Sequence, residues 1–184
     1  MRERVPQIEV VRTWLENERV KPGVDVEFDP DEPEWALVAK LLDSCAFEAS
    51  FLWRYPIAWY RFDLDESRFR RLRVIDGPEN ESWRRLSPDG SVLGAARRIL
   101  ADELTGTYDD VDVTRVRQIA AALPAPSRRL VLFKRDHGER PTIADGNHYA
   151  TARAIRLLQT GEYTPQWAYL GVRRRVQLGV RDHL

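Results

Sequence analysis

Apolar residues recur at helical spacing through the first third of the chain. Ile8, Val11 and Leu15 lie on one face of a helical wheel, which predicts a first helix. After an acidic loop and a proline, a longer helix is predicted over residues 34–52. The apolar stripe of this second helix is formed by Trp35, Val38, Leu42 and Cys45.

The pattern changes at residue 57, where aromatic and apolar residues begin to alternate with polar ones. This alternation predicts a strand over residues 57–64. Later segments predict helices near 92–104, 113–123 and 148–160, and strands at 130–133, 142–144 and 167–172. Because only a short polar loop separates them, the strands at 130–133 and 142–144 are expected to pair as an antiparallel hairpin.

This order of elements predicts an α+β fold, in which a small mixed sheet with flanking helices is preceded by an N-terminal helical extension. The extension is expected over residues 1–56, the core over 57–172 and a basic C-terminal tail over 173–184. A length of 184 residues suits one domain of ordinary size with one elaboration.

The composition limits which partners the protein is expected to bind and in which cellular compartment it is expected to lie. Lys plus Arg and Asp plus Glu are 29 each, so the net charge is zero and no long-range field attracts nucleic acid or an anionic membrane. The single cysteine, Cys45, excludes an internal disulfide. No apolar run approaches the roughly 18 to 20 residues that span a bilayer. With a charged N-terminus that lacks a signal-peptide core, the chain is expected to be cytoplasmic and free of the membrane.

The six tryptophans of the chain are candidates for stacking on nucleic-acid bases. Trp14, Trp35 and Trp59, however, fall on apolar stripes of the predicted elements. These three side chains are therefore expected to pack in the core.

The ten residues from Pro141 to Ala150, PTIADGNHYA, concentrate the candidate chemistry. An apolar strand end leads into Gly146, where the backbone can approach a ligand closely, and a new helix follows. The unpaired N–H groups and the positive dipole end of that helix favour an anion. Asp145, Asn147 and His148 would surround this anion. In the alternative interpretation, Asp145 or Asn147 only caps the helix and His148 packs nearby.

The segment PTIADGNHYATARAIRLL resembles the ParB/sulfiredoxin superfamily, which includes ParB-like nuclease and nucleotide-binding domains. Members carry a strand, a short glycine-containing polar turn that ends in His-Arg or a variant, and a helix. The helix at 113–123 and the strands at 130–133 and 167–172 occur in the order that such domains show. The resemblance covers roughly residues 57–172, and it implies the family's fold and a nucleotide phosphate site. Sulfiredoxins use ATP, ParB-type clamps use CTP, and free serine kinases of the family phosphorylate a small substrate.

The resemblance also implies roles for individual residues. Asp145 and His148 match the Asp-Gly-x-His form of the kinase-like members and are the catalytic candidates. Asn147 stands where sulfiredoxins carry their catalytic cysteine, so a sulfiredoxin reaction is not expected. Tyr149 stands where many members have arginine, and Arg153, one turn later, is the candidate substitute. The phosphate-binding candidates are Gly146, Asn147, His148, Tyr149 and Arg153.

The chemistry implied at this turn is phosphate handling. Backbone N–H groups near His148 and Tyr149 would bind phosphate oxygens, and Asp145 would act as a base or as a ligand of magnesium. The expected cofactors are ATP, ADP or CTP with magnesium, and the partner is a nucleotide or another phosphorylated small molecule. Whether the protein is an enzyme is left open. If it is one, phosphotransfer or nucleotide hydrolysis is the reaction.

Two alternatives to phosphate handling stay open, and so does the oligomeric state. Tyr149, Arg153 and Arg156 share one face of the helix at 148–160, and the two arginines could join residues 173–175 in a nucleic-acid-binding module of the same fold. Zero net charge argues against this use. A non-catalytic protein-interaction domain is the other alternative, and a homodimer is not excluded.

Overall fold

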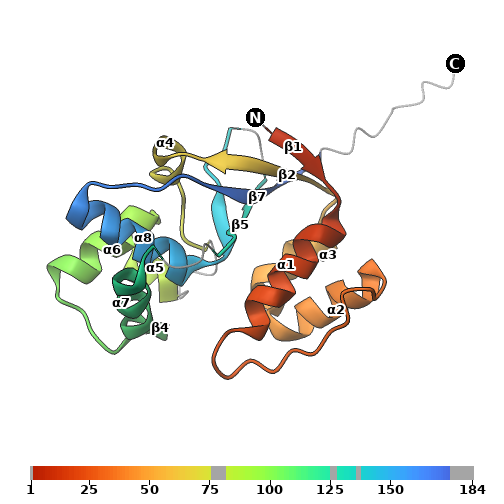
Figure 1. Cartoon of the computed structure of the whole chain (residues 1–184), viewed down its shortest axis with the longest axis horizontal. Helices are drawn as coiled ribbons and strands as arrows, with labels where there is room; N and C mark the ends of the chain where they lie inside the picture. The colour runs from red at the N-terminus through yellow and green to blue at the C-terminus, as the bar shows by residue number, and fades with distance from the viewer. Residues whose placement is uncertain (1, 76–81, 125–127, 136–137, 175–184) are drawn as a thin grey trace, which may run out of the picture.

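The computed structural model describes residues 2–75, 82–124, 128–135 and 138–174. Its centre is a mixed five-stranded sheet with the strand order β1-β2-β7-β5-β6 (Figure 1). The strands are β1 (Arg2–Val5), β2 (Ile57–Leu64), β5 (Val131–Lys134), β6 (Thr142–Asp145) and β7 (Gln166–Arg173). β7 runs parallel to β5 and antiparallel to β2, while the β1-β2 and β5-β6 pairs are antiparallel. The α+β class with a mixed sheet is thus confirmed.

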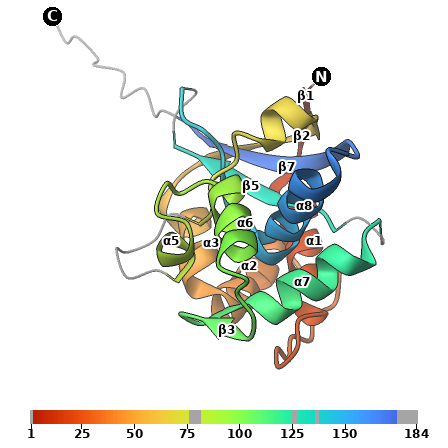
Figure 2. The same ribbon diagram turned by 90° about the vertical axis from the view of Figure 1, so that its left-hand side faces the viewer.

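Helices cover both faces of this sheet. The first face is covered by α1 (Gln7–Arg19), α2 (Glu34–Ser44) and α3 (Ala46–Arg54), and the opposite face by α6 (Val92–Ala101), α7 (Val113–Ala122) and α8 (Asn147–Thr160) (Figures 1 and 2). Shorter elements complete the second side, namely α4 (Glu66–Phe69), α5 (Ser82–Leu86), β3 (Thr107–Tyr108) and β4 (Val111–Asp112). The segment expected to form an N-terminal extension therefore supplies an edge strand and one layer of the core.

Alternation along the central strand divides the core into two clusters. On β7, Ala168 and Leu170 pack among the residues of α6, α7 and α8. Trp167 and Tyr169 point to the other side, toward α1, α2 and α3. Because successive side chains of a strand face opposite sides of the sheet, one strand serves both layers. Both clusters are needed to bury this strand.

The helix predicted over residues 34–52 is interrupted at Cys45. The backbone of Cys45 has φ −146° and ψ 59°, and it ends α2 and begins α3. The bend lets Leu41 pack beside α1 while Phe51 stacks on Phe133 of β5, with 4.1 Å between ring centroids. Cys45 itself is buried, its thiol lies 3.2 Å from the Leu41 carbonyl oxygen, and burial raises the pKa of the thiol.

The prediction that Trp35 packs in the core is wrong, since 76% of its surface is exposed. It lies in the first turn of α2, whose buried side is formed by Leu37, Val38 and Leu41 instead. The apolar stripe is therefore rotated away from Trp35, because α2 packs along α1. The same prediction is confirmed for Trp14 and Trp59, which are 0% and 2% exposed.

The later elements agree closely with the pattern. The predicted hairpin at 130–133 and 142–144 is the β5-β6 pair, and the helix predicted at 148–160 is α8. Gly161 ends α8 in the left-handed conformation, with φ 73°. Within the described ranges, no helix combines the length and apolarity needed to cross a membrane. From residue 175 onward, the predicted C-terminal tail lies outside the described residues.

Candidate functional site

Gly146 joins β6 to α8 at the centre of the candidate site. Its φ of 102° lies in the left-handed region, which favours glycine. A Cβ atom at this position would lie 2.5 Å from Cδ2 of the fully buried Leu130. The glycine is therefore required both by the backbone conformation and by the close packing against Leu130, and it fixes where the first turn of α8 begins.

The first turn of α8 has no side-chain cap. The interpretation that Asp145 or Asn147 caps this helix is therefore wrong. The Asn147 side-chain oxygen accepts a hydrogen bond of 3.0 Å from the Ile75 N–H instead, which ties the turn to the segment beside β6. The first hydrogen bond within α8 runs from the Ala150 N–H to the Gly146 carbonyl oxygen, at 2.8 Å. The N–H groups of residues 147–149 thus remain available, as at any uncapped helix start.

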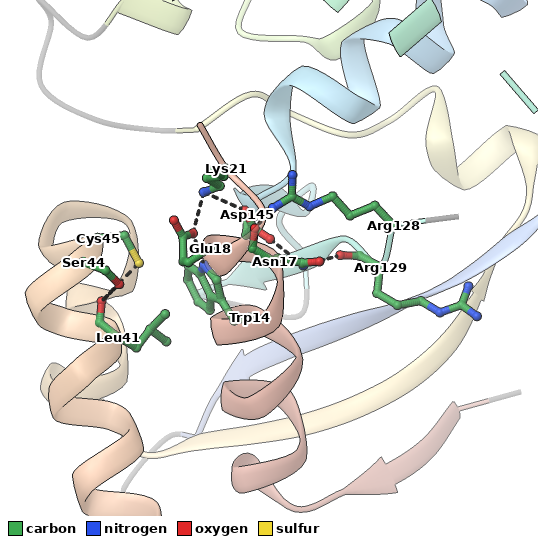
Figure 3. A network of polar contacts seen from close by, with 10 residues as sticks. All are labelled: Trp14, Asn17, Glu18, Lys21, Leu41, Ser44, Cys45, Arg128, Arg129 and Asp145. Carbon is green, nitrogen blue, oxygen red and sulfur yellow. Dashed lines mark hydrogen bonds and ion pairs between the residues drawn. The ribbon is translucent and has the colours of Figure 1, made fainter. Parts of the chain in front are cut away.

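Asp145 is held by side chains of α1 and the residues that follow it (Figure 3). It is 3% exposed. Asn17 Nδ2 donates to its Oδ2 at 2.7 Å, and Lys21 Nζ lies 3.2 Å from its Oδ1. Lys21 also pairs with Glu18, which accepts a hydrogen bond of 3.1 Å from Trp14 Nε1. One ammonium group therefore serves two buried carboxylates, and both oxygens of Asp145 are engaged.

The pKa values of Glu18 and Lys21 are both raised, although burial acts on the two groups in opposite directions. Burial raises the pKa of Glu18, and the nearby Asp145 carboxylate adds to the effect. Burial alone would lower the pKa of Lys21, but Asp145 and Glu18 together raise it above its ordinary value. Lys21 is therefore a firmly held cation. Its ammonium group already lies 3.2 Å from Asp145 Oδ1.

His148 is the second residue of α8 and packs beside α5. Its ring packs edge-on against Trp83 of α5, with centroids 5.0 Å apart. Its Nε2 atom is buried and has no hydrogen-bond partner among the described residues. Burial, followed by the charge of Arg115, lowers the pKa of His148 to about 4. The imidazole is therefore neutral near pH 7.

This shift predicts the titration of His148. Because its folded pKa is about 4 and its ordinary value is 6.5, the unfolded chain binds a proton that the folded chain does not in the interval between them. His148 is thus expected to reduce stability progressively as the pH falls from 6.5 towards 4. Ring-proton NMR shifts should show a midpoint near pH 4 for His148. A midpoint near 6.5 would contradict the buried, unpaired environment.

Three cationic side chains, Lys21, Arg115 and Arg128, lie close enough to His148 in the first turn of α8 to act on its charge, and the Asp112 carboxylate acts on it with the opposite sign. Lys21 lies at Asp145, and Arg128 donates from its guanidinium group to the Asn17 carbonyl oxygen. Arg115, from the first turn of α7, has its pKa lowered by burial and then by the neighbouring charge of Arg128. Each of these three cations also lowers the pKa of His148. Two adjacent arginines beside unpaired helix N–H groups form an arrangement that an anion would stabilise.

Tyr149 and Arg153, the other two binding candidates, lie on a different face of α8. Arg153 is 8% exposed and donates to Gln166 Oε1 at 2.8 Å and to the Thr164 carbonyl oxygen. Arg156, on the same face, donates to the Leu123 carbonyl oxygen at 2.8 Å. The structure therefore brings Asp145, Gly146, Asn147 and His148 together at one turn, and turns Tyr149 and Arg153 away from it.

A basic cavity of about 640 Å³ lies beside β6. Five cationic side chains line it, Arg54, Arg73, Lys134, Arg135 and Arg140, together with the carboxylates of Glu48 and Glu139. The cavity reaches Ile75, whose N–H donates to Asn147 in the first turn of α8. The described residues of its lining carry a formal charge of +3, in a chain whose net charge is zero. Nothing in the sequence pattern indicated this cavity, because its lining comes from α3, β5, β6, the connection between β5 and β6, and the segment before residue 76.

Among the described residues, no cluster of three or more His, Cys, Asp or Glu side chains could hold a metal ion. The residues at Asp145 do not fit a protein-held magnesium ion either, since Lys21 already neutralises that carboxylate. No protein-family model, curated protein or solved structure matches this chain.

Proposed function

We propose that this protein binds a nucleotide or another phosphorylated small molecule, with a phosphate group at the first turn of α8. The observation that carries the proposal is that this helix of 14 residues begins without a side-chain cap, among Lys21, Arg115 and Arg128. Free N–H groups and the positive end of the helix dipole favour a phosphate. The three cationic side chains would offset the negative charge of the phosphate.

Each group near the turn has a distinct role in this proposal. The N–H groups of residues 147–149 bind phosphate oxygens, and Gly146 allows the close approach. His148 is neutral, so the tautomer protonated at Nε2 donates one further hydrogen bond. Arg115 and Arg128 provide charge-assisted hydrogen bonds. The basic cavity beside β6, which reaches Ile75 next to Asn147, provides room for the rest of the molecule.

Asp145 is a positioning residue in this proposal and has no catalytic role. Its two oxygens accept from Asn17 and pair with Lys21, so it is not free to remove a proton from a substrate hydroxyl. The proposal is therefore limited to binding. ATP, ADP and CTP are the nucleotides to test first, and any magnesium would be held by their phosphate oxygens and water.

A ParB/sulfiredoxin-like fold is part of the same proposal. The order α7, β5, β6, α8 and β7 supports it, as does the Asp-Gly-Asn-His turn between β6 and α8. Tyr149 is the departure that weighs against a family-type phosphate site, and Arg153 does not replace the missing arginine because its guanidinium group is bound to Gln166 and Thr164.

Thermal unfolding in the presence of ATP, ADP, CTP or GTP with magnesium tests this proposal. A ligand at 100 times its dissociation constant stabilises the folded state by about 2.7 kcal/mol, which is a readily measured shift. We expect one of these nucleotides to give such a shift, and we expect His148→Ala and Arg115→Gln to remove most of it. Arg97→Gln is the matched control, because Arg97 is exposed on α6.

The variants also define what would contradict the proposal. Their unfolding without nucleotide should remain cooperative, since neither His148 Nε2 nor the Arg115 guanidinium group forms a hydrogen bond with another described residue. If nucleotide shifts the unfolding of His148→Ala and Arg115→Gln as much as it shifts the unchanged protein, the ligand does not bind at the first turn of α8. Absence of a shift with every nucleotide would reject nucleotide binding altogether.

A further inference from the structure

A second cavity, of about 290 Å³, lies between α8 and the segment that leads into β7. Three aromatic rings and three guanidinium groups line it, those of Tyr149, Tyr163, Trp167, Arg129, Arg153 and Arg156. The face of α8 that carries Tyr149 and Arg153 therefore forms part of the cavity wall. The proposed phosphate site makes no use of this cavity.

Gln166 places an unused hydrogen-bond donor in the wall of this cavity. The residue is 8% exposed, and its Nε2 atom is buried without a hydrogen-bond partner among the described residues. Its Oε1 accepts from Arg153 Nη1 at 2.8 Å, which fixes the orientation of the amide, because the flipped amide would set two donors against each other. A buried donor without an acceptor costs free energy, so this atom calls for an acceptor beyond those that the described residues supply.

The charges around the cavity indicate that the acceptor is anionic. Of the lining residues that the structure describes, Arg129, Arg153 and Arg156 are cationic, and Glu162 alone carries a carboxylate. Glu162 lies 3.7 Å from Arg156, at the exposed edge. This leaves an excess of positive charge beside the Gln166 amide. A carboxylate could accept from Gln166 Nε2 with one oxygen and face the arginines with the other.

The walls indicate that the ligand is flat. The Arg129 guanidinium group lies 4.0 Å from the centroid of the Trp167 ring, and that of Arg153 lies 4.9 Å from the centroid of Tyr163. Aromatic rings and stacked guanidinium groups favour a planar partner. A volume of 290 Å³ is at the small end for ligand sites, which suits a molecule of one or two rings.

We propose that this cavity binds a small planar carboxylate, such as an aromatic acid of one or two rings, with a carboxylate oxygen accepting from Gln166 Nε2. This cavity shares only Tyr149 with the first turn of α8, where the ring lines the cavity and the backbone N–H belongs to the turn, and the proposal does not depend on nucleotide binding. The two proposals are distinguishable, because neither Arg115 nor His148 is among the described residues that line this cavity.

Titration with sodium benzoate at constant ionic strength, followed by two-dimensional NMR, tests this proposal. We expect saturable shifts of the Gln166 side-chain amide and the Trp167 indole signals. Gln166→Glu is the decisive variant, because it keeps an acceptor for Arg153 but replaces the Nε2 donor by a negatively charged oxygen. The apparent affinity for benzoate should fall at least about tenfold, which corresponds to 1.4 kcal/mol. Gln118→Glu, at an exposed position of α7, is the matched control and should bind as the unchanged protein does.

Two further probes test the charge and the shape of the ligand. Benzamide keeps the ring but not the charge, and cyclohexanecarboxylate keeps the charge but not the flat ring. Both should bind more weakly than benzoate. The proposal is overturned if benzoate gives no saturable shift, if Gln166→Glu binds it unchanged, or if either second probe binds as tightly.

Discussion

Replacement of Gly146 by alanine is expected to lower the free energy of unfolding by roughly 2 to 4 kcal/mol. Two costs add: a side chain at φ 102°, and the contact of the new Cβ with Leu130 Cδ2 at 2.5 Å. Leu130 is fully buried in the core cluster beneath α8, so it cannot move aside freely. Urea denaturation of the variant and the unchanged protein measures the difference.

Gly161→Ala is the matched control for this prediction. Gly161 also has a positive φ, of 73°, but nothing lies within 4 Å of the position of an added Cβ. Its replacement should therefore cost only about 1 kcal/mol, which is the conformational part. Equal losses for the two alanine variants would show that the contact with Leu130 relaxes at no cost, contrary to the argument from packing.

Removal of the ammonium group in Lys21→Met is expected to be the other large effect, lowering the free energy of unfolding by about 3 to 5 kcal/mol at pH 7. The substitution leaves the Glu18 and Asp145 carboxylates, whose side chains are 3% and 1% exposed, without their shared cation. The two negative charges would then repel each other within the protein. Chemical denaturation at pH 7 measures the loss.

The loss in Lys21→Met should shrink as the pH is lowered from 7 towards 5. The pKa of Glu18 is already raised above its ordinary value of 4.5, and removal of Lys21 takes away the charge that lowers it. The folded variant therefore binds a proton at a higher pH than the unfolded chain, so stability is regained as the pH falls. A loss that stays constant between pH 7 and pH 5 would contradict this coupling.

Lys40→Met is the control for burial. Lys40 forms an ion pair of 2.5 Å with Glu32, but both side chains are well exposed, at 37% and 25%. Surface pairs of this kind contribute little to stability, so the loss in Lys40→Met should be much smaller than the loss in Lys21→Met. A loss of similar size in Lys40→Met and Lys21→Met would indicate that burial of the Glu18 and Asp145 carboxylates has no special cost.

The periodicity of the sequence was sufficient to predict most strands of the sheet and α8, because an element that buries one face has apolar residues at regular intervals. β2 extends over Ile57–Leu64, as its alternation predicts. β1 was missed, since three of its four residues are charged, as is common at a sheet edge. The break at Cys45 was missed as well, because α1 and β5 dictate it and no residue of the helix signals it.

The candidate site shows more clearly than the strands what cannot be predicted from residues that are neighbours in the sequence. The turn from Asp145 to His148 was evident from residue types alone. Its partners were not, since Asn17 precedes Asp145 by 128 positions and no spacing rule links them. Helical periodicity also placed Tyr149, Arg153 and Arg156 on one face, which is confirmed by their shared cavity. What that face contacts depends on residues 162–167, which only the fold brings there.

The position of β7 has a consequence for how the chain folds. Among the described strands, β7 alone joins the β1-β2 pair to the β5-β6 pair, and it is the last of them in the sequence. Until residue 166 and those after it are in place, the chain can form two separate antiparallel pairs but no continuous sheet. Its pairing with β2 joins residues about a hundred positions apart, and such distant contacts slow folding. During synthesis, therefore, both helical layers must wait for this final strand before they have a common sheet on which to pack.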